Sequence, residues 1–167
     1  RTGLRLVRSM NAIAHHAPAP RAARVRPAAR AKASSADTPV VEQLERIERD
    51  GGDGEVVFDE DTALAVTSLD KVFFPARGVT KGGLMRYYAR VEPAILPLLR
   101  DRPLAFKRFP EGVDGPSFYQ HEPRNWPESA RTARVRIEDG SVRPRLVGGD
   151  LATLLYTVQL GAISAHP

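Results

Sequence analysis

The sequence of 167 residues contains no cysteine. Disulfide scaffolds, thiol catalysis and cysteine-rich zinc sites are therefore excluded. Long hydrophobic runs are also missing, because no stretch approaches the roughly 20 apolar residues that a membrane-spanning helix needs. Hydrophobic residues make up 42% of the chain and aromatic residues 7%, which is typical of a globular protein with a polar appendage. We expect one soluble, intracellular domain without a membrane partner.

Acidic residues are missing from residues 1–36, which carry eight basic side chains and a net charge of +8. The charge then reverses to −9 over residues 37–70 and returns to +6 over residues 71–167. A basic last block predicts an anionic partner, and nucleic acid is the first candidate. An ordinary solvated surface is the alternative that charge alone leaves open.

Residues 1–39 are rich in alanine, arginine and proline and show no apolar periodicity. Such a segment cannot form a core, so we predict a disordered tail. The composition resembles a transit peptide. The first residue, however, is Arg1 rather than methionine, and we favour an interdomain linker. Its arginines would add salt-sensitive attraction to phosphate.

The folded part, residues 40–167, reads as an α/β (α+β) domain with a mixed sheet flanked by helices. Helical spacing of apolar residues over residues 40–50 predicts a short helix that ends at Gly51 and Gly52. Two short strands follow, separated by an acidic turn, and then a loop punctuated by proline and glycine over residues 71–83.

Thr80 is the expected N-cap of the next helix. The predicted buried face of that helix comprises Leu84, Tyr87, Tyr88 and Val91. We expect Pro93 to open a second, separate helix that Pro97 kinks or shortens.

The last third of the chain contains three further predicted elements. Residues 102–109 are expected to form a strand, and the Asp139-Gly140 pair to close a hairpin over residues 133–147. A final helix is expected over residues 148–167, capped by Asp150 and buried through Leu151, Leu154, Leu155 and Val158.

Motifs of common catalytic centres are absent. The sequence contains no glycine-rich phosphate loop, no G-x-S-x-G elbow and no H-E-x-x-H helix. Its only D-x-D pair, Asp59 and Asp61, falls in a predicted acidic turn, which we interpret as solvated rather than as a metal site. No metal ligands are assigned within the chain.

Basic residues instead alternate with aromatic ones. Lys81 opens a helix, where free backbone N–H groups and the helix dipole favour a phosphate. Lys71, Lys107 and Arg108 precede the Phe118-Tyr119 pair, and this combination is typical of proteins that grip nucleic-acid backbones and stack on bases. The alternative is that the aromatic side chains belong to the core and that Lys107 lies at a strand edge.

Four motifs resemble a known family. They are L-D-K-x-x-x-P from Leu69, G-x-T-K ending at Lys81, R-P-x-x-x-K-R from Arg102 and G-V-D-G-P-x-F from Gly112. In this order, with a Tyr-Tyr helix between them, they are similar to the polymerase domain of bacterial DNA ligase D. That domain belongs to the archaeo-eukaryotic primase superfamily, and the resemblance covers roughly residues 40–167.

The resemblance implies site residues. Lys71 and Lys81 match the two basic residues that bind the 5′-phosphate at a DNA gap or break. Phe118 and Tyr119 match a base-stacking pair. Lys107 and Arg108 match a pair on the nucleotide and DNA side of the active site, and His166 is expected to approach the phosphates of the incoming nucleotide.

The resemblance also implies an activity. The family adds nucleotides, often ribonucleotides, to 5′-phosphorylated breaks or gaps in bacterial non-homologous end joining. It is a nucleotidyltransferase that uses Mn²⁺ or Mg²⁺ and nucleoside triphosphates. Its metal-binding carboxylates lie beyond the position that matches Pro167. We therefore expect the N-terminal, DNA-end-binding part of such a polymerase, inactive alone, holding no metal and located in the cytoplasm at the nucleoid.

Two alternatives stay open. The chain is either a non-catalytic module that binds 5′-phosphorylated DNA ends or an inactive fragment whose tail alone attracts DNA. Ku and a ligase domain are possible partners of the family.

Overall fold

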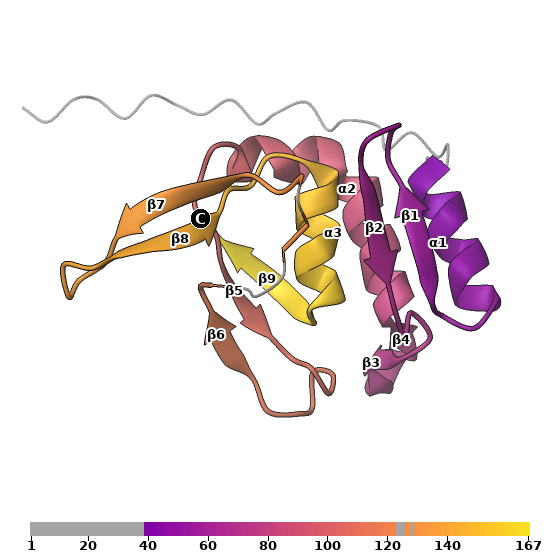
Figure 1. Ribbon diagram of the computed structural model, residues 1–167. Coiled ribbons are helices and arrows are strands. Elements are labelled where there is room, and N and C mark those ends of the chain that lie inside the picture. Colours follow the sequence, from indigo (N-terminus) through magenta and orange to yellow (C-terminus); the bar gives the residue numbers. More distant parts are fainter. Residues whose placement is uncertain (1–38, 123–125, 128) are drawn as a thin grey trace, which may run out of the picture. The chain divides into compact units, whose positions relative to one another are not determined.

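The computed structural model describes residues 39–122, 126–127 and 129–167, so the tail predicted over residues 1–39 lies outside the described part, except for Pro39, which begins a helix. Within the described part, three α-helices, a short 3-10 helix and nine strands follow one another along the chain (Figure 1). The predicted mixed α/β class is confirmed. None of the described helices is long and apolar enough to cross a membrane.

The first unit is a helix followed by a two-stranded hairpin, as predicted. Its elements are α1 (Pro39–Arg49), β1 (Gly54–Val57) and β2 (Ala63–Val66). Val41, Leu44 and Ile47 form the buried side of α1, which is the expected helical spacing. The acidic turn between the strands is closed by a hydrogen bond from the backbone N–H of Phe58 to the carbonyl of Thr62.

The predicted loop over residues 71–83 is a small hairpin followed by the start of a helix, so that prediction was wrong. The hairpin consists of β3 (Val72–Phe74), the 3-10 turn η1 (Pro75–Arg77) and β4 (Val79–Thr80). Phe73 is 1% exposed, and its burial holds the hairpin against the core. The turn ends at Gly78, whose φ of 62° suits glycine.

One continuous helix, α2 (Lys81–Leu99), replaces the two helices that the prolines predicted. Pro93 and Pro97 are four residues apart and share the exposed side of α2. Their rings therefore lie at the surface rather than in the core, although each removes one backbone donor from the helix. Met85 and Ala89 are buried, whereas Tyr87 is 57% exposed, so the buried face is rotated from the predicted one.

A three-stranded antiparallel sheet lies beside α3 (Leu151–Gln159), with the order β6-β5-β9 (Figure 1). Its strands are β5 (Ala105–Arg108), β6 (Phe118–Gln120) and β9 (Ala162–His166). The predicted cap of α3 is confirmed, because the carboxylate of Asp150 accepts from the N–H of Thr153 at 2.7 Å.

The end of α3 differs from the prediction. The helix stops at Gln159, and Gly161, with φ of 87°, turns the chain back into β9. His166 therefore lies on a strand rather than at the end of a helix. The sequence from residue 162 onward forms a strand because it pairs with the edge of β5 that β6 leaves open, with a register shift between Lys107 and Arg108.

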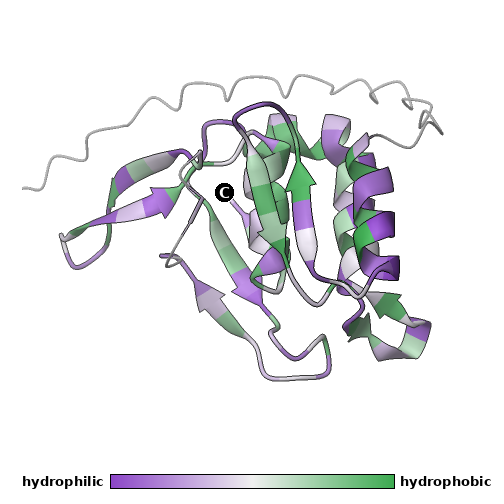
Figure 2. Cartoon of the chain, turned by 45° about the vertical axis from the view of Figure 1, so that its right-hand side comes forward, coloured by the Kyte–Doolittle hydropathy of each residue, from purple (hydrophilic) through white to green (hydrophobic). Residues whose placement is uncertain are grey.

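The predicted hairpin around Asp139-Gly140 is confirmed as β7 (Thr132–Arg136) paired with β8 (Val142–Leu146). The core lies where α2 packs against both α1 and α3, and it includes Leu44, Met85, Phe106 and Leu155, each fully buried. Figure 2 shows hydrophobic residues along the elements that meet there and hydrophilic stretches on the β7–β8 hairpin.

Candidate nucleic-acid interface

Lys71 and Lys81, ten residues apart in the sequence, are neighbours in the structure. Lys71 directly precedes β3, and Lys81 directly follows β4 as the first residue of α2. The backbone N–H of Lys81 donates to the carbonyl of Lys71 at 2.8 Å. The β3–β4 hairpin therefore brings the two lysines together at its open end.

Lys81 is buried, with 6% of its surface exposed. The pKa of Lys81 is lowered from 10.5 to about 8, chiefly by burial and then by the positive charge of Lys71, while Asp53 and Asp70 act in the opposite direction. Its ammonium group forms no hydrogen bond or ion pair with another residue of the described part. A buried cation beside a second cation is an unfavourable arrangement that an anionic ligand would relieve.

Lys71 is more exposed and has two partners. Its ammonium group donates to the carbonyl of Pro110 at 2.8 Å and to the carboxylate of Glu111 at 2.9 Å. Both partners lie in the turn that follows β5, about forty residues further along the chain. The turn is fixed to β3 by a bond from the N–H of Val113 to the carbonyl of Phe73.

The backbone N–H groups at the start of α2 are all used within the chain, contrary to expectation. Lys81 donates to Lys71, as described, and Gly82 donates to the carbonyl of Leu69 at 2.8 Å. Gly83 donates to the hydroxyl of Thr80 at 2.9 Å, which confirms the predicted N-cap. A phosphate here would be held by the ammonium groups and not by the free amides of a helix N-terminus.

Glu48 stabilises the start of α2, and no sequence pattern indicated this role. Its carboxylate accepts from the hydroxyl of Thr80 at 2.5 Å and forms an ion pair with Arg86. A Cβ at Gly82 would lie 2.5 Å from the Glu48 carboxylate and 3.1 Å from the carbonyl oxygen of Leu69, so a side chain there would displace Glu48 from its present position. The absence of a side chain at Gly82 therefore lets Glu48 of α1 approach the start of α2.

A second group of predicted residues lies on one face of the β6-β5-β9 sheet. Lys107 is paired with Tyr119 on one side and with Ser164 on the other, and His166 follows two residues later on β9. The rings of Tyr119 and His166 are 6.0 Å apart between centroids. The Lys107 ammonium lies 5.9 Å from the centre of the Tyr119 ring, and the Ser164 hydroxyl lies 3.1 Å from His166 Nε2.

Arg108 and Phe118 lie on the opposite face of the same sheet, because side chains alternate along a strand. The Arg108 guanidinium lies 5.3 Å from the centre of the Phe118 ring. It also donates to the carbonyl of Leu160 and, at 2.6 Å, to the side chain of Gln120. Burial lowers the pKa of Arg108. The Phe118-Tyr119 and Lys107-Arg108 pairs are thus each divided between the two faces.

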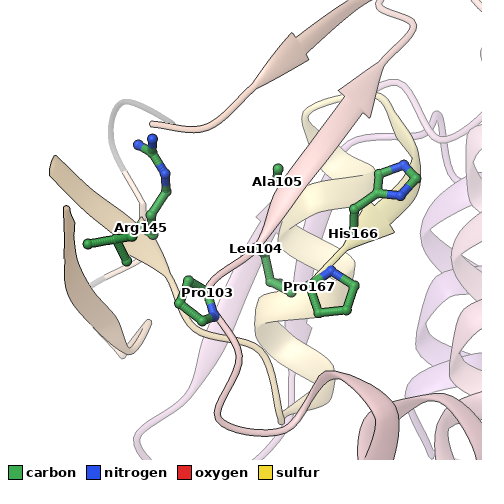
Figure 3. A pocket seen from close by; sticks show the side chains of 7 residues that line it. Pro103, Leu104, Ala105, Arg145, His166 and Pro167 are labelled. Carbon is green, nitrogen blue, oxygen red and sulfur yellow. The ribbon is translucent and has the colours of Figure 1, made fainter. Parts of the chain in front are cut away.

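A cavity of about 200 Å³ connects this sheet to the β7–β8 hairpin. Figure 3 shows Arg145 of β8 and His166 of β9 on either side of β5, with Ala105 between them. Arg145 is 9% exposed and donates to Glu122 at 3.0 Å. Arg145 was not predicted as a site residue, and the sequence offered only its place in a basic hairpin.

A larger cavity of about 520 Å³ includes none of the predicted site residues. Its lining includes the carboxylates of Asp59, Glu92 and Asp150, which would repel a phosphate. Asp59 accepts from the N–H of Asp61 at 3.0 Å, and this bond lowers the pKa of Asp59. Among the residues that the structure describes, no group of three or more His, Asp or Glu side chains could hold a metal ion.

Comparison with known proteins identifies the family to which this chain belongs. The model of the LigD primase-polymerase domain matches residues 80–167. The chain therefore belongs to the LigD primase-polymerase domain family, as the sequence motifs indicated.

Individual relatives are bacterial end-joining proteins. The chain is 33% identical over 105 residues to the multifunctional non-homologous end joining DNA repair protein LigD of Mycobacterium tuberculosis, covering 62% of this chain and 14% of that protein. It is 33% identical over 103 residues to the bifunctional non-homologous end joining protein LigD of Bacillus subtilis, covering 62% and 16%. The chain thus spans about one seventh of these relatives.

A solved structure agrees with these matches. The polymerase domain of Mycobacterium tuberculosis ligase D in complex with DNA superposes with a TM-score of 0.58 at 29% identity. The match covers 61% of this chain and 36% of that structure.

Proposed function

We propose that residues 40–167 form the DNA-end-binding part of a repair polymerase and that Lys71 and Lys81 bind the 5′-phosphate of a gap or break. The observation that carries the proposal is the buried ammonium of Lys81 beside Lys71. Each cation raises the energy of the other, and a phosphate between them would neutralise both. The solved relative is named as a complex with DNA, which supports this class of ligand.

The face of the β6-β5-β9 sheet that carries Lys107, Tyr119 and His166 is the proposed site for the DNA strand and the incoming nucleotide. Tyr119 offers an exposed ring for stacking on a base, and Lys107 offers a charge for the backbone. His166 is the proposed contact to the triphosphate. Arg108 and Phe118, on the opposite face, would act on this site by holding β6 to β5 and to the end of α3.

For the whole protein inside the bacterial cell, the proposed activity is nucleotidyl transfer. This reaction would use Mn²⁺ or Mg²⁺ and nucleoside triphosphates, with Ku and a ligase domain as partners. The described residues do not fit the metal requirement, because two-metal transfer needs several carboxylates close together. No step of that reaction is assigned to residues of this chain. A non-catalytic end-binding module would use the same two lysines.

The test is a binding titration of the chain against gapped DNA with either a 5′-phosphate or a 5′-hydroxyl at the gap, at fixed salt. The unmutated chain is expected to prefer the phosphate. The variant with Lys71→Ala and Lys81→Ala is expected to bind both DNAs equally, losing about 100-fold or more in affinity for the phosphorylated one, since hydrogen bonds to charged groups contribute about 1.5–3 kcal/mol each and two are removed.

Arg77→Ala is the matched control, because it removes an exposed charge from the same hairpin. It should lower the affinity for both DNAs equally and leave the preference intact. Equal binding of both DNAs by the unmutated chain would exclude the proposed phosphate site.

A further inference from the structure

The ion pair between Lys71 and Glu111 places a carboxylate on a cation that is proposed to bind phosphate. Glu111 Oε2 lies 2.9 Å from the Lys71 ammonium. The Glu111 side chain is 68% exposed, and that of Lys71 is 36% exposed. Carboxylate and phosphate oxygens compete for the same donors. A phosphate that approaches Lys71 therefore meets an anion already in place.

The position of Glu111 is fixed by the backbone on both sides of it. The Pro110 carbonyl accepts from Lys71, and Gly112 donates to the carbonyl of Phe109 at 3.0 Å. Gly112 has φ of 89°, and a Cβ there would lie 3.2 Å from the carbonyl oxygens of Val72 and Phe73. The turn is therefore packed directly on β3, next to Lys71, so its backbone is held in place while the exposed side chain of Glu111 can still rotate.

Lys81 has no such counterion. Its ammonium forms no ion pair with any described side chain, although Asp53 and Asp70 act on it electrostatically. The two lysines thus differ: one is buried and unpaired, and the other is partly exposed and paired with an anion that can rotate into solvent.

We infer that Glu111 is a specificity-determining residue of the end-binding site, a displaceable carboxylate that occupies Lys71 until a terminal phosphate replaces it. The inference rests on the proposed role of the two lysines. A terminal phosphate carries about −1.5 to −2 charges at pH 7, whereas a carboxylate or an internal phosphodiester carries one. Only the terminal phosphate has the additional charge needed to displace Glu111. The carboxylate therefore lowers the affinity of this site for phosphate and limits its occupation by internal phosphates.

The test is Glu111→Gln, which keeps the shape of the side chain and removes its charge. Affinity for gapped DNA with a 5′-phosphate is expected to rise about threefold to tenfold, because an exposed ion pair contributes up to about 1 kcal/mol and repulsion of the ligand is removed as well. Affinity for DNA with a 5′-hydroxyl is expected to rise by a larger factor, most of all at low salt, because internal phosphates can then enter the vacated site. The preference for the 5′-phosphate is therefore expected to narrow.

Glu60→Gln is the matched control, since Glu60 is an exposed glutamate in the β1–β2 turn. It changes the net charge by the same amount and should alter both affinities equally and slightly. An unchanged or lower affinity of the Glu111→Gln variant for phosphorylated DNA, relative to this control, would overturn the inference and would mean that Glu111 orients Lys71.

A titration with inorganic phosphate distinguishes the competing role of Glu111 from the proposed DNA-end site. Its binding is followed by the amide NMR signals of Lys81 and Gly112, without DNA. Tighter binding of phosphate by Glu111→Gln, together with equal binding of the two gapped DNAs by the unmutated chain, would support the competing role of Glu111 while excluding the DNA-end site. A clear preference of the unmutated chain for the 5′-phosphate, with no effect of Glu111→Gln on either ligand, would retain the site and exclude the competition.

Discussion

A lysine that is nearly inaccessible to solvent lowers the stability of a fold when it is charged, and Lys81 is such a residue. Its pKa is about 8 in the folded chain and 10.5 when unfolded. Between these values the unfolded chain binds more protons, so the free energy of unfolding rises as the pH rises from about 8 to about 10.5. Below pH 8 the cost of the buried charge is fully present.

Lys81→Met is therefore expected to stabilise the chain by about 1–3 kcal/mol at pH 7, since each pKa unit corresponds to about 1.4 kcal/mol. The gain should shrink between pH 8 and pH 10.5, because the lysine is neutral in the folded chain over this range and the cost of deprotonating it on folding falls as the pH rises. Urea unfolding at several pH values measures this. A loss of stability at pH 7 would show that Lys81 serves the fold rather than a ligand.

The identities of the site residues could be predicted from sequence motifs, but their surroundings could not. Nothing near Lys71 in the sequence indicates Glu111, which reaches it from forty residues away through the turn after β5. Glu48 reaches Thr80 from a different helix in the same way. Such contacts depend on tertiary packing, and local patterns contain no information about them.

At the level of elements, alternation along β6 assigns different roles to two adjacent aromatic residues. Tyr119→Ala is expected to lower the affinity for gapped DNA about tenfold, because stacking of one base contributes about 1–3 kcal/mol. Phe118→Ala is the matched control on the opposite face, where the ring contacts Arg108. It should change the affinity less than about threefold and lower the melting temperature more than Tyr119→Ala does.

Fluorescence anisotropy with labelled gapped DNA and thermal unfolding measure these two effects. Equal losses of affinity in both variants would mean that the strand contacts both faces of β6, and would contradict the division of the aromatic pair.

Elements with strong local signals were predicted correctly, and those decided by distant contacts were not. Thr80 and Asp150 cap their helices, and Asp139-Gly140 closes its hairpin, because each signal acts within a few residues. By contrast, α2 continues through Pro93 because its prolines face solvent, and β9 exists because β5 offers it a pairing edge. Neither circumstance can be read from a window of sequence.

At the level of the whole molecule, charge is distributed unevenly along the sequence. We therefore expect general attraction to DNA and recognition of a DNA end to depend on different parts of the chain. Residues 1–36 hold a net charge of +8, while the proposed phosphate site lies in the folded part. Charge of this kind increases affinity without selectivity and makes it depend on salt.

Deletion of residues 1–36 is therefore expected to weaken binding to all DNAs and to reduce the slope of log affinity against log salt. The preference for a 5′-phosphate should survive unchanged. Titrations of the full and shortened chains at three salt concentrations, with both gapped DNAs, measure the slope and the preference together. Loss of all DNA binding on deletion would assign the affinity to the tail alone and favour the inactive-fragment interpretation.

The β3–β4 hairpin separates the spacing of the two lysines in the sequence from their spacing in the folded chain. The backbone bond between Lys81 and Lys71 fixes their relation at the open end of the hairpin, while η1 and Gly78 form the opposite, closed end. Residues inserted at the closed end would lengthen the loop without separating the lysines. The phosphate site would therefore tolerate changes in loop length there, and a search for related sites should allow a variable gap between the two lysines.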